Sequence, residues 1–322
     1  MFKVIMAPTD GSDLERPAIA LAVRLAKRFE AELHLVRVET PPVAVDPASS
    51  PGVLEITEET VAEARQARLG KLEALGAECR ALGEIRVITA FEHGIVAPTL
   101  MDYAKRVNAD LIVIASHARG GLKRLTLGSV TDFLIRRSDT PVLVVKPSAS
   151  MTDGDPAYTL NRVLVPLDGS AVAEQILPLV ASFAARLHAT VSLVYVLTPL
   201  TYAQKQIMQP GLPWWDEDIA TANAYLTEVA SRLMAEGLTV GKEVVLSENI
   251  PSAILDYSLR MRADLIAIAT NGRGGVSRLL FGGVADEVTR TSPTSLLVFH
   301  PGQITVHPEP AAPDEARNHI KA

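Results

Sequence analysis

The 322-residue sequence contains a single cysteine, Cys79, so it cannot form an intrachain disulfide, and this fits a reducing compartment. It also lacks clustered basic residues. Its formal net charge of −6 argues against a nucleic-acid partner, because phosphate contacts need clustered lysine and arginine. No apolar run reaches the length of a membrane span, about 18 residues, so we expect no membrane partner. The opening residues resemble a strand and turn rather than a secretory signal, and we expect a cytoplasmic protein.

Familiar catalytic signatures are missing as well. The Gly-x-Ser-x-Gly motif of hydrolases is absent, and so is the Walker motif of many nucleotide hydrolases. The seven histidines show no metal-ligand spacing. We therefore expect no catalytic residues and no metal held by protein side chains.

The sequence does contain an internal repeat, in which one unit occurs twice. The segment FKVIMAPTDGS at 2–12 returns as NRVLVPLDGS at 161–170, and ADLIVIA at 109–115 returns as ADLIAIA at 263–269. A repeat of this length indicates two whole domains rather than the units of a solenoid. The segment between the copies is rich in serine, proline, glycine and aspartate, which is typical of a linker. The sequence thus predicts a first domain at 1–147, a linker at 148–160, a second domain at 161–301 and a loose tail at 302–322.

Within each copy, short β-rich runs alternate with helical patterns, which is typical of βαβ units and a parallel sheet. In the first copy we expect strands at Phe2–Met6, Glu32–Val38, Glu84–Ile88, Leu111–Ala115 and Val142–Val145, with helices near Asp13–Phe29, Ile56–Ala77, Ile95–Val107 and Ser129–Arg137. In the second copy we expect strands at Arg162–Val165, Thr190–Val196, Thr239–Val245, Leu265–Ala269 and Ser295–Phe299. The fold class is α/β, with two tandem doubly wound open sheets of five mainly parallel strands each.

A strand order of 3-2-1-4-5 would place a ligand-binding crevice between strands one and four of each copy. The loops that leave those strands are PTDGS and SHARGGLKRLTLGS in the first copy, and PLDGS and TNGRGGVSRLLFGG in the second. These loops are the best-repeated ones in the chain, and they lie where chemistry is expected.

On these residues each copy resembles a universal stress protein domain, and the chain resembles the tandem form of that family over roughly residues 1–300. ATP-binding members of the family show Gly-x-x-Gly, a spacer and then Gly-Ser or Gly-Thr, with an aspartate after strand one. Glycines let the backbone approach ribose and phosphate, and the Gly-Ser opens a helix whose free N–H groups receive the phosphates. The resemblance implies a stress-response protein that binds ATP, with Mg²⁺ held through the phosphates, as a nucleotide-regulated switch.

Neither copy matches the family pattern completely. The first copy has alanine at both loop glycines, Ala115 and Ala118, and keeps the terminal Gly128-Ser129. The second copy keeps Gly272 but ends in Gly282-Gly283, without the hydroxyl. Each copy has lost a different half of the motif, so we expect inequivalent sites and at most weak or one-sided nucleotide binding. A nucleotide-free scaffold or interaction protein that retains only the fold is the open alternative. A weaker alternative is a slow ATPase, because bound phosphates need only a water molecule.

The positions that correspond to the family's nucleotide-binding residues form two parallel sets. In the first copy they are Pro8, Thr9, Asp10, Val38, Ala115, Ser116, His117, Ala118, Arg119, Gly128, Ser129 and Val130. In the second copy they are Pro166, Asp168, Val196, Ala269, Thr270, Asn271, Gly272, Arg273, Gly282, Gly283 and Val284. Taken singly, Asp10 and Asp168 also suit ordinary Asp-Gly-Ser turns.

The last strand of each copy would be an exposed apolar edge in a lone domain. In the family this strand commonly pairs across a dimer, so the resemblance implies that the two copies form an intrachain pseudo-dimer. The alternative is that helices cover these strands and the domains are separable. The expected partners are an adenine nucleotide and a protein that the sequence does not identify. A homodimer of the tandem chain is compatible with the same resemblance.

Overall fold

The computed structural model describes residues 2–40, 58–116, 127–146, 160–198, 214–270 and 283–300. The strands of the first half are β1 (Val4–Pro8), β2 (Glu32–Glu39), β3 (Val87–His93), β4 (Leu111–Ala115) and β5 (Val142–Val145). Its helices are η1 (Asp13–Glu15), α1 (Arg16–Phe29), α2 (Glu58–Gly83), α3 (Val96–Arg106) and α4 (Ser129–Arg137).

The second half repeats this arrangement. Its strands are β6 (Arg162–Leu167), β7 (Thr190–Leu197), β8 (Val240–Leu246), β9 (Leu265–Ala269) and β10 (Ser295–Phe299). Its helices are α5 (Ala171–Glu174), α6 (Leu177–Leu187), α8 (Trp214–Ala235), α9 (Ile250–Arg260) and α10 (Gly283–Thr291). Residues 148–159 of the expected linker and the expected tail lie outside the described residues.

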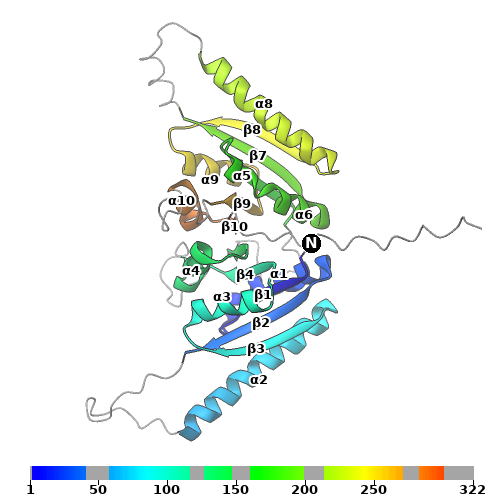
Figure 1. The fold of residues 1–322 in the computed structure, drawn as a ribbon, viewed down its shortest axis with the longest axis vertical. Coiled ribbons are helices and arrows are strands. Elements are labelled where there is room, and N and C mark those ends of the chain that lie inside the picture. The colour runs from blue at the N-terminus through cyan, green and yellow to red at the C-terminus, as the bar shows by residue number, and fades with distance from the viewer. Residues whose placement is uncertain are drawn as a thin grey trace, which may run out of the picture.

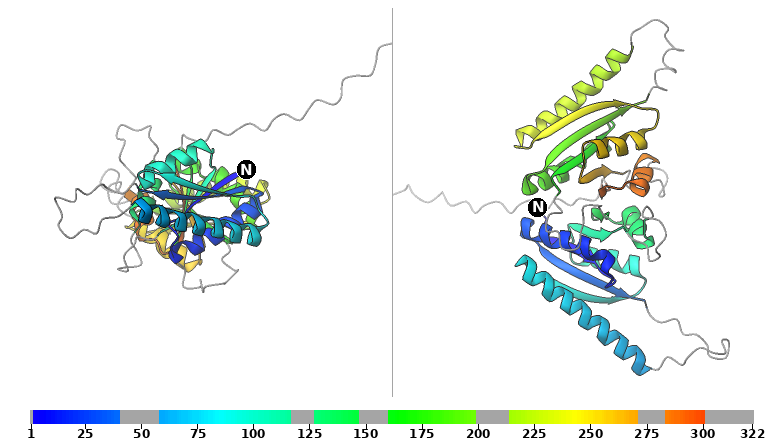
Figure 2. Two further views of the ribbon diagram at one scale, coloured as in Figure 1. Left: turned by 90° about the horizontal axis from the view of Figure 1, so that it is seen from below. Right: turned by 180° about the vertical axis from the view of Figure 1, so that it is seen from behind.

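All ten strands join into one sheet in the order β3-β2-β1-β4-β5-β10-β9-β6-β7-β8. Each half therefore has the predicted order 3-2-1-4-5, and pairing within each half is parallel. The halves meet through an antiparallel pair in which Leu297 of β10 lies opposite Leu143 of β5. Figures 1 and 2 show the halves on either side of this junction, with α2 and α8 at the far ends. The predicted intrachain pseudo-dimer is confirmed.

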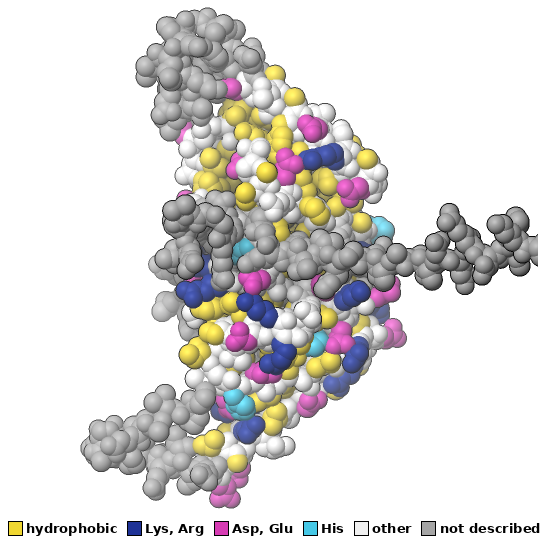
Figure 3. All heavy atoms as spheres, in the orientation of Figure 1, with side chains coloured by type: hydrophobic (Ala, Val, Ile, Leu, Met, Phe, Trp, Pro, Cys, Tyr) yellow, Lys and Arg dark blue, Asp and Glu magenta, His cyan; other side chains and the backbone are white. Residues whose placement is uncertain are grey.

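Helices cover both faces of the sheet. Helices α1, α2, α6 and α8 contribute to the apolar core on one face, and α3, α4, α9 and α10 to the core on the other. The central strands β4 and β9 are buried and apolar on both faces, as parallel strands covered by helices must be. On the face shown in Figure 3, acidic and basic side chains are interspersed over the N-terminal half.

The sequence located most elements closely, but it misplaced the third strand. The expected strand Glu84–Ile88 is wrong in position, because α2 continues to Gly83 and Glu84 turns the chain with φ of 52°. The strand β3 begins only at Val87. It is an outer strand of the sheet with mostly half-buried residues, so its polar and apolar side chains do not form the clear pattern of a central strand.

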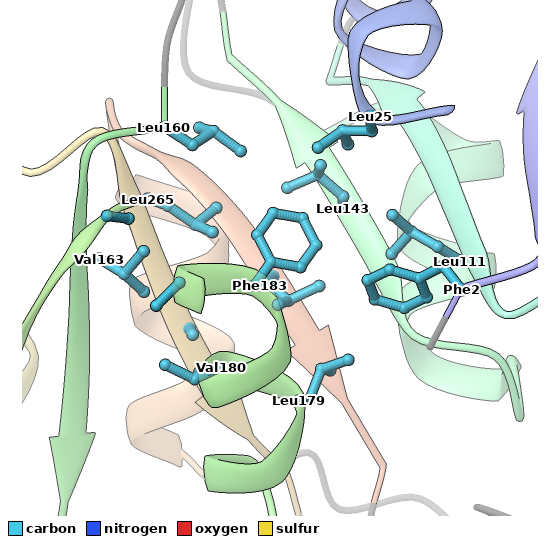
Figure 4. Close-up of a cluster of buried hydrophobic side chains, with 14 of the residues drawn as sticks. Phe2, Leu25, Leu111, Leu143, Leu160, Val163, Leu179, Val180, Phe183 and Leu265 are labelled. Carbon is cyan, nitrogen blue, oxygen red and sulfur yellow. The ribbon is translucent and has the colours of Figure 1, made fainter. Parts of the chain in front are cut away.

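Aromatic side chains join the two halves on the α1/α6 face. The ring centroid of Phe2 lies 4.7 Å from that of Phe29 and 5.6 Å from that of Phe183, and Phe29 lies 5.5 Å from Phe183. Figure 4 shows Phe183 of α6 pointing into a cluster with Phe2, Leu143 and Leu111 of the first half. The two domains therefore share one continuous hydrophobic core across the junction.

On the opposite face, four charged residues link α4 to α10. Arg136 binds Asp132 of its own helix at 3.0 Å and also pairs with Asp286 across the junction. Arg290 binds Asp286 at 3.0 Å and lies 3.6 Å from Asp132. Burial alone would raise the pKa of Asp286, but hydrogen bonds from Arg136 and Arg290 lower it below the ordinary value. The four residues are related by the pseudo-twofold symmetry of the two copies, because Asp132 corresponds to Asp286 and Arg136 to Arg290.

Truncating Phe183 tests the shared core. We expect Phe183→Ala to lower the free energy of unfolding by about 3–5 kcal/mol, because a fully buried ring would leave a cavity between the halves. Urea denaturation followed by circular dichroism measures the change. As a control, Leu259→Ala removes a side chain that is 58% exposed and should change stability by less than about 0.5 kcal/mol. An unchanged midpoint for Phe183→Ala would contradict the shared core.

Candidate functional site

The candidate site of each half lies at the carboxyl ends of the first and fourth strands. In the first half the chain leaves β1 at Thr9 and β4 at Ser116, and β1 and β4 are adjacent. In the second half β6 and β9 are adjacent and lead to Asp168 and Thr270. Val38 on β2 and Val196 on β7 lie near the ends of the neighbouring strands, so the structure brings the predicted elements together at one edge of each half.

A buried carboxylate that sequence reasoning missed organises the turn after β1. Glu15 accepts hydrogen bonds from the backbone N–H of Asp10 at 2.8 Å and of Gly11 at 3.0 Å, and from the hydroxyl of Thr9. Glu15 is 8% exposed, and burial raises its pKa despite these hydrogen bonds. The Ser12-x-x-Glu15 spacing is typical of a helix capping box and could have indicated this residue.

The hydroxyl of Thr9 therefore serves the turn. Thr9 is 7% exposed, its backbone N–H donates to the Val36 carbonyl, and its hydroxyl donates to Glu15. Thr9 lies beside Asp10 in the strand-one element, and its hydroxyl contributes to the turn.

Asp10 and Asp168 are turn residues at the open edge of the sheet. The Ser12 N–H donates to Asp10 Oδ1 at 2.9 Å, and the Ser170 N–H donates to Asp168 Oδ1 at 2.9 Å. Both residues are exposed. The turn hydrogen bonds fix the direction of each carboxylate, so the turn role and a ligand-binding role are compatible.

The glycine that follows each aspartate has a positive φ, 80° for Gly11 and 79° for Gly169. A Cβ atom at Gly11 would come within 2.5 Å of Arg37 Nη1, so an arginine covers this turn. At Gly169 the nearest atom to such a Cβ would be Tyr195 Cε2, at 3.8 Å. The two turns share their backbone geometry and differ in the side chain that covers them.

The second half supports its turn differently. Leu167 and Ala173 occupy the positions of Thr9 and Glu15, so the buried carboxylate has no counterpart there. The Ser170 hydroxyl instead accepts a hydrogen bond from the Ala173 N–H at 3.1 Å and caps α5. The two copies therefore stabilise the same turn with different hydrogen bonds, to the Glu15 carboxylate in the first and to the Ser170 hydroxyl in the second.

The predicted helix start after β4 is confirmed in the first half. The Gly128 N–H donates to the Ser116 carbonyl at 3.1 Å, which closes the base of the loop between them. Helix α4 begins at Ser129, and the residue at its N-cap position, Gly128, has no side chain to cap it. Its first N–H groups have no partner within the helix and can receive an anion. These donors suit a phosphate group better than a cation.

The second half differs at the corresponding positions. Helix α10 begins at Gly283, so the hydroxyl of Ser129 has no counterpart. Thr270 is 2% exposed, and its hydroxyl hydrogen-bonds to Nδ1 of His300. The ring of His300 also contacts the Ile135 carbonyl across the domain junction. Thr270 thus belongs to the domain interface.

Several predicted site residues lie outside the described residues: His117, Ala118, Arg119, Asn271, Gly272, Arg273 and Gly282. Pro8, Ala115, Val130, Pro166, Ala269 and Val284 are half-buried at the ends of their strands or in the first turns of α4 and α10. Within the described ranges, no group of three or more histidine, cysteine, aspartate or glutamate side chains could hold a metal ion. None of the described helices is long and apolar enough to cross a membrane.

Comparisons with known proteins agree with this architecture. The sequence pattern of the universal stress protein family matches residues 1–146 and again residues 159–300. A universal stress protein of Mycolicibacterium smegmatis is 28% identical over 306 residues, which is 92% of this chain and 97% of that protein. One from Methanocaldococcus jannaschii is 34% identical over 147 residues, 45% of this chain and 83% of its own length.

A solved universal stress protein structure from Archaeoglobus fulgidus has the same fold. It superposes with a TM-score of 0.69 at 19% identity, covering 93% of this chain and 98% of its own. The chain belongs to the universal stress protein family, and it carries two copies of the family domain.

Removal of the buried carboxylate tests the first turn. We expect Glu15→Ala to destabilise the protein by about 2 kcal/mol, because two N–H groups and one hydroxyl lose their shared acceptor. Thermal unfolding at neutral pH measures the loss. Glu228→Ala, on the exposed side of α8, should leave the melting temperature nearly unchanged. Equal effects of the two substitutions would show that Glu15 does not hold the turn.

The buried amine of Lys146 should make the stability of the protein depend on pH. Lys146 follows β5, is 4% exposed, and burial lowers its pKa from 10.5 to about 8. Below pH 8 the amine is charged in both the folded and the unfolded state, so folding carries the full cost of burying the charge. Between pH 8 and 10.5 the unfolded chain binds more protons, and the stability of the folded state rises with pH.

We therefore expect Lys146→Met to stabilise the protein at pH 7 by roughly 2 to 3 kcal/mol, and this gain to shrink as the pH rises toward 10. Urea denaturation at several pH values measures both effects. Lys242→Met, at an exposed position on β8, should show no such pH dependence. A stability difference that stays constant from pH 7 to pH 10 would contradict the lowered pKa.

Proposed function

We propose that this chain is a cytoplasmic stress-response protein that binds ATP or another adenine nucleotide at the loops after the first and fourth strands. The observation that carries the proposal is the start of α4. An uncapped helix N-terminus opens at Ser129, at the same edge of the sheet as the carboxylate of Asp10. A helix N-terminus attracts phosphate, and a carboxylate can accept hydrogen bonds from ribose hydroxyls or a base amino group.

In this proposal the chain's own residues bind and orient the nucleotide. The N–H groups at the start of α4 hold the phosphates, and Mg²⁺ is bound only through those phosphates. Glu15 keeps Asp10 and Gly11 in position, and Arg37 covers Gly11. No residue of the chain attacks the nucleotide in this proposal, because the hydroxyls of Thr9 and Thr270 are buried and hydrogen-bonded to Glu15 and His300. Turnover would therefore be limited to slow hydrolysis by water.

The proposed role as a switch rests on the ring that joins α4 and α10. A bound nucleotide can shift the protein only if it binds one conformation more tightly than another. A phosphate bound at the N-terminus of α4 would contact the helix that carries Asp132 and Arg136. Arg136 pairs with Asp286 of α10, and Asp132 pairs with Arg290 of α10. The surface of both helices is then the place where a protein partner would sense the ligand.

The division of the chain belongs to the same proposal. We propose that residues 1–147 and 161–301 are the two functional domains, joined by a linker at 148–160 and followed by a tail at 302–322. The two family matches and the repeated strand order support it. A homodimer of the tandem chain is a further possibility for assembly, and the open outer edges at β3 and β8 are compatible with it.

Labelled ATP tests the proposed function directly. We expect saturable binding of about one ATP per chain in equilibrium dialysis. We expect Asp10→Ala to weaken this binding by about tenfold, which corresponds to loss of one charged hydrogen bond. Asp168→Ala is the matched control, because the same turn in the second copy lacks the Ser129 hydroxyl nearby. No saturable binding at micromolar protein would favour the nucleotide-free scaffold instead.

A further inference from the structure

Lys146 is a buried cation that the proposed nucleotide site does not yet use. It is 4% exposed, and burial is the cause of its lowered pKa. Within the described residues, its side-chain amine has no hydrogen-bond acceptor and no acidic partner. Burying an unpaired charge is costly, and buried charges in proteins are generally paired or bound to a ligand. The described part of the protein does not neutralise this charge.

Lys146 lies beside the base of the phosphate loop. Ala115 of β4 is paired with Val145 of β5, and the Ser116 N–H donates to the Val145 carbonyl at 3.1 Å. Continuing this register places Lys146 next to Ser116, about 4.8 Å away across the sheet. The Ser116 carbonyl also accepts from Gly128, the residue immediately before α4. Ser116 thus lies between Lys146 and the start of α4.

The alternation of β5 places Lys146 on the face that carries α4. Val142 and Val144 pack in the core that includes Leu134 and Ile135 of α4. Lys146 follows Val144 by two residues, and side chains two residues apart in an extended segment share a face. The amine and the N-terminus of α4 therefore share both a face and an edge of the sheet.

The second copy has no such cation. His300 occupies the position that corresponds to Lys146, directly after β10. Its ring contacts the Thr270 hydroxyl and the Ile135 carbonyl, so both ring nitrogens have partners within the protein. The first copy therefore combines a serine at the start of its helix with a lysine that has no acidic partner among the described residues, and the second copy has neither.

We propose that Lys146 binds the phosphate groups of an anionic ligand at the first copy, and that this copy is the one that holds the nucleotide. The proposal rests on the proposed function for the identity of the ligand, and on the position of Lys146 for the phosphate contact. A lysine ammonium is a compact point charge suited to phosphate oxygens. A bound polyphosphate would supply a counterion that the described residues do not provide.

Isothermal titration with ATP, adenosine and inorganic tripolyphosphate tests the assignment on the full chain. We expect Lys146→Met to weaken binding of ATP and tripolyphosphate by about tenfold or more, the size of a charge-assisted hydrogen bond. Adenosine affinity should stay the same, because adenosine carries no phosphate. Lys146→Arg should keep the affinity for both phosphate ligands within about threefold. Lys242→Met, an equal change in net charge at an exposed site of the second half, should bind all three ligands like the wild type.

The outcomes separate this inference from the function on which it rests. Equal tripolyphosphate affinities for wild type and Lys146→Met would overturn the role of Lys146, whether or not ATP binds. Tripolyphosphate binding that depends on Lys146, without saturable ATP binding, would support the phosphate contact and reject the nucleotide function. Equal weakening of adenosine and ATP by Lys146→Met would mean that the residue acts on the fold and would overturn the proposal. Loss of folding is not expected, because Lys146→Met removes a buried charge.

Discussion

The antiparallel pairing of β5 with β10 is the interaction on which the whole molecule depends. Each strand is short and apolar on both faces, and each would be an exposed edge in a single domain. Pairing them satisfies the backbone of both strands and merges two five-stranded sheets into one. The Phe2–Phe29–Phe183 cluster on one face and the Asp132–Arg136–Asp286–Arg290 ring on the other form only because this pairing sets the distance between the halves.

The junction also decides how freely the two copies could diverge. A separate domain must keep its own site to keep its function. When two domains are fixed to one another, one can keep a site while the corresponding residues of the other contribute to the interface. The first copy retains the uncapped helix start at Ser129, while the second uses Thr270 and His300 to contact the first. In the first copy a glycine without a capping side chain precedes the helix, whereas in the second copy Thr270 and His300 stabilise the interface.

The first copy also holds two buried ionisable side chains that the second copy lacks. Lys146 carries a buried charge without a partner in the described structure, and Glu15 is a buried carboxylate that must accept several hydrogen bonds to be tolerated. Neither feature is repeated in the second copy, where His300 and Ala173 stand at these positions. The cost of burying Lys146 is what the proposed binding role would explain, since proteins often give up stability at functional sites.

The sequence alone determined the repeat, the helix that begins at Ser129 and the sequence differences between the two loops that follow the fourth strands. These features depend on local patterns of apolar residues, glycines and turn residues, which are read within a few positions of one another. The tertiary structure decided the placement of β3, the use of the Thr9 hydroxyl by Glu15, the burial of Lys146 and the ring that joins α4 to α10. Most of these depend on residues brought together from distant parts of the chain, and even the contact of Thr9 with Glu15 depends on how the turn packs. No local pattern specifies which side chains will meet when two sheets join edge to edge.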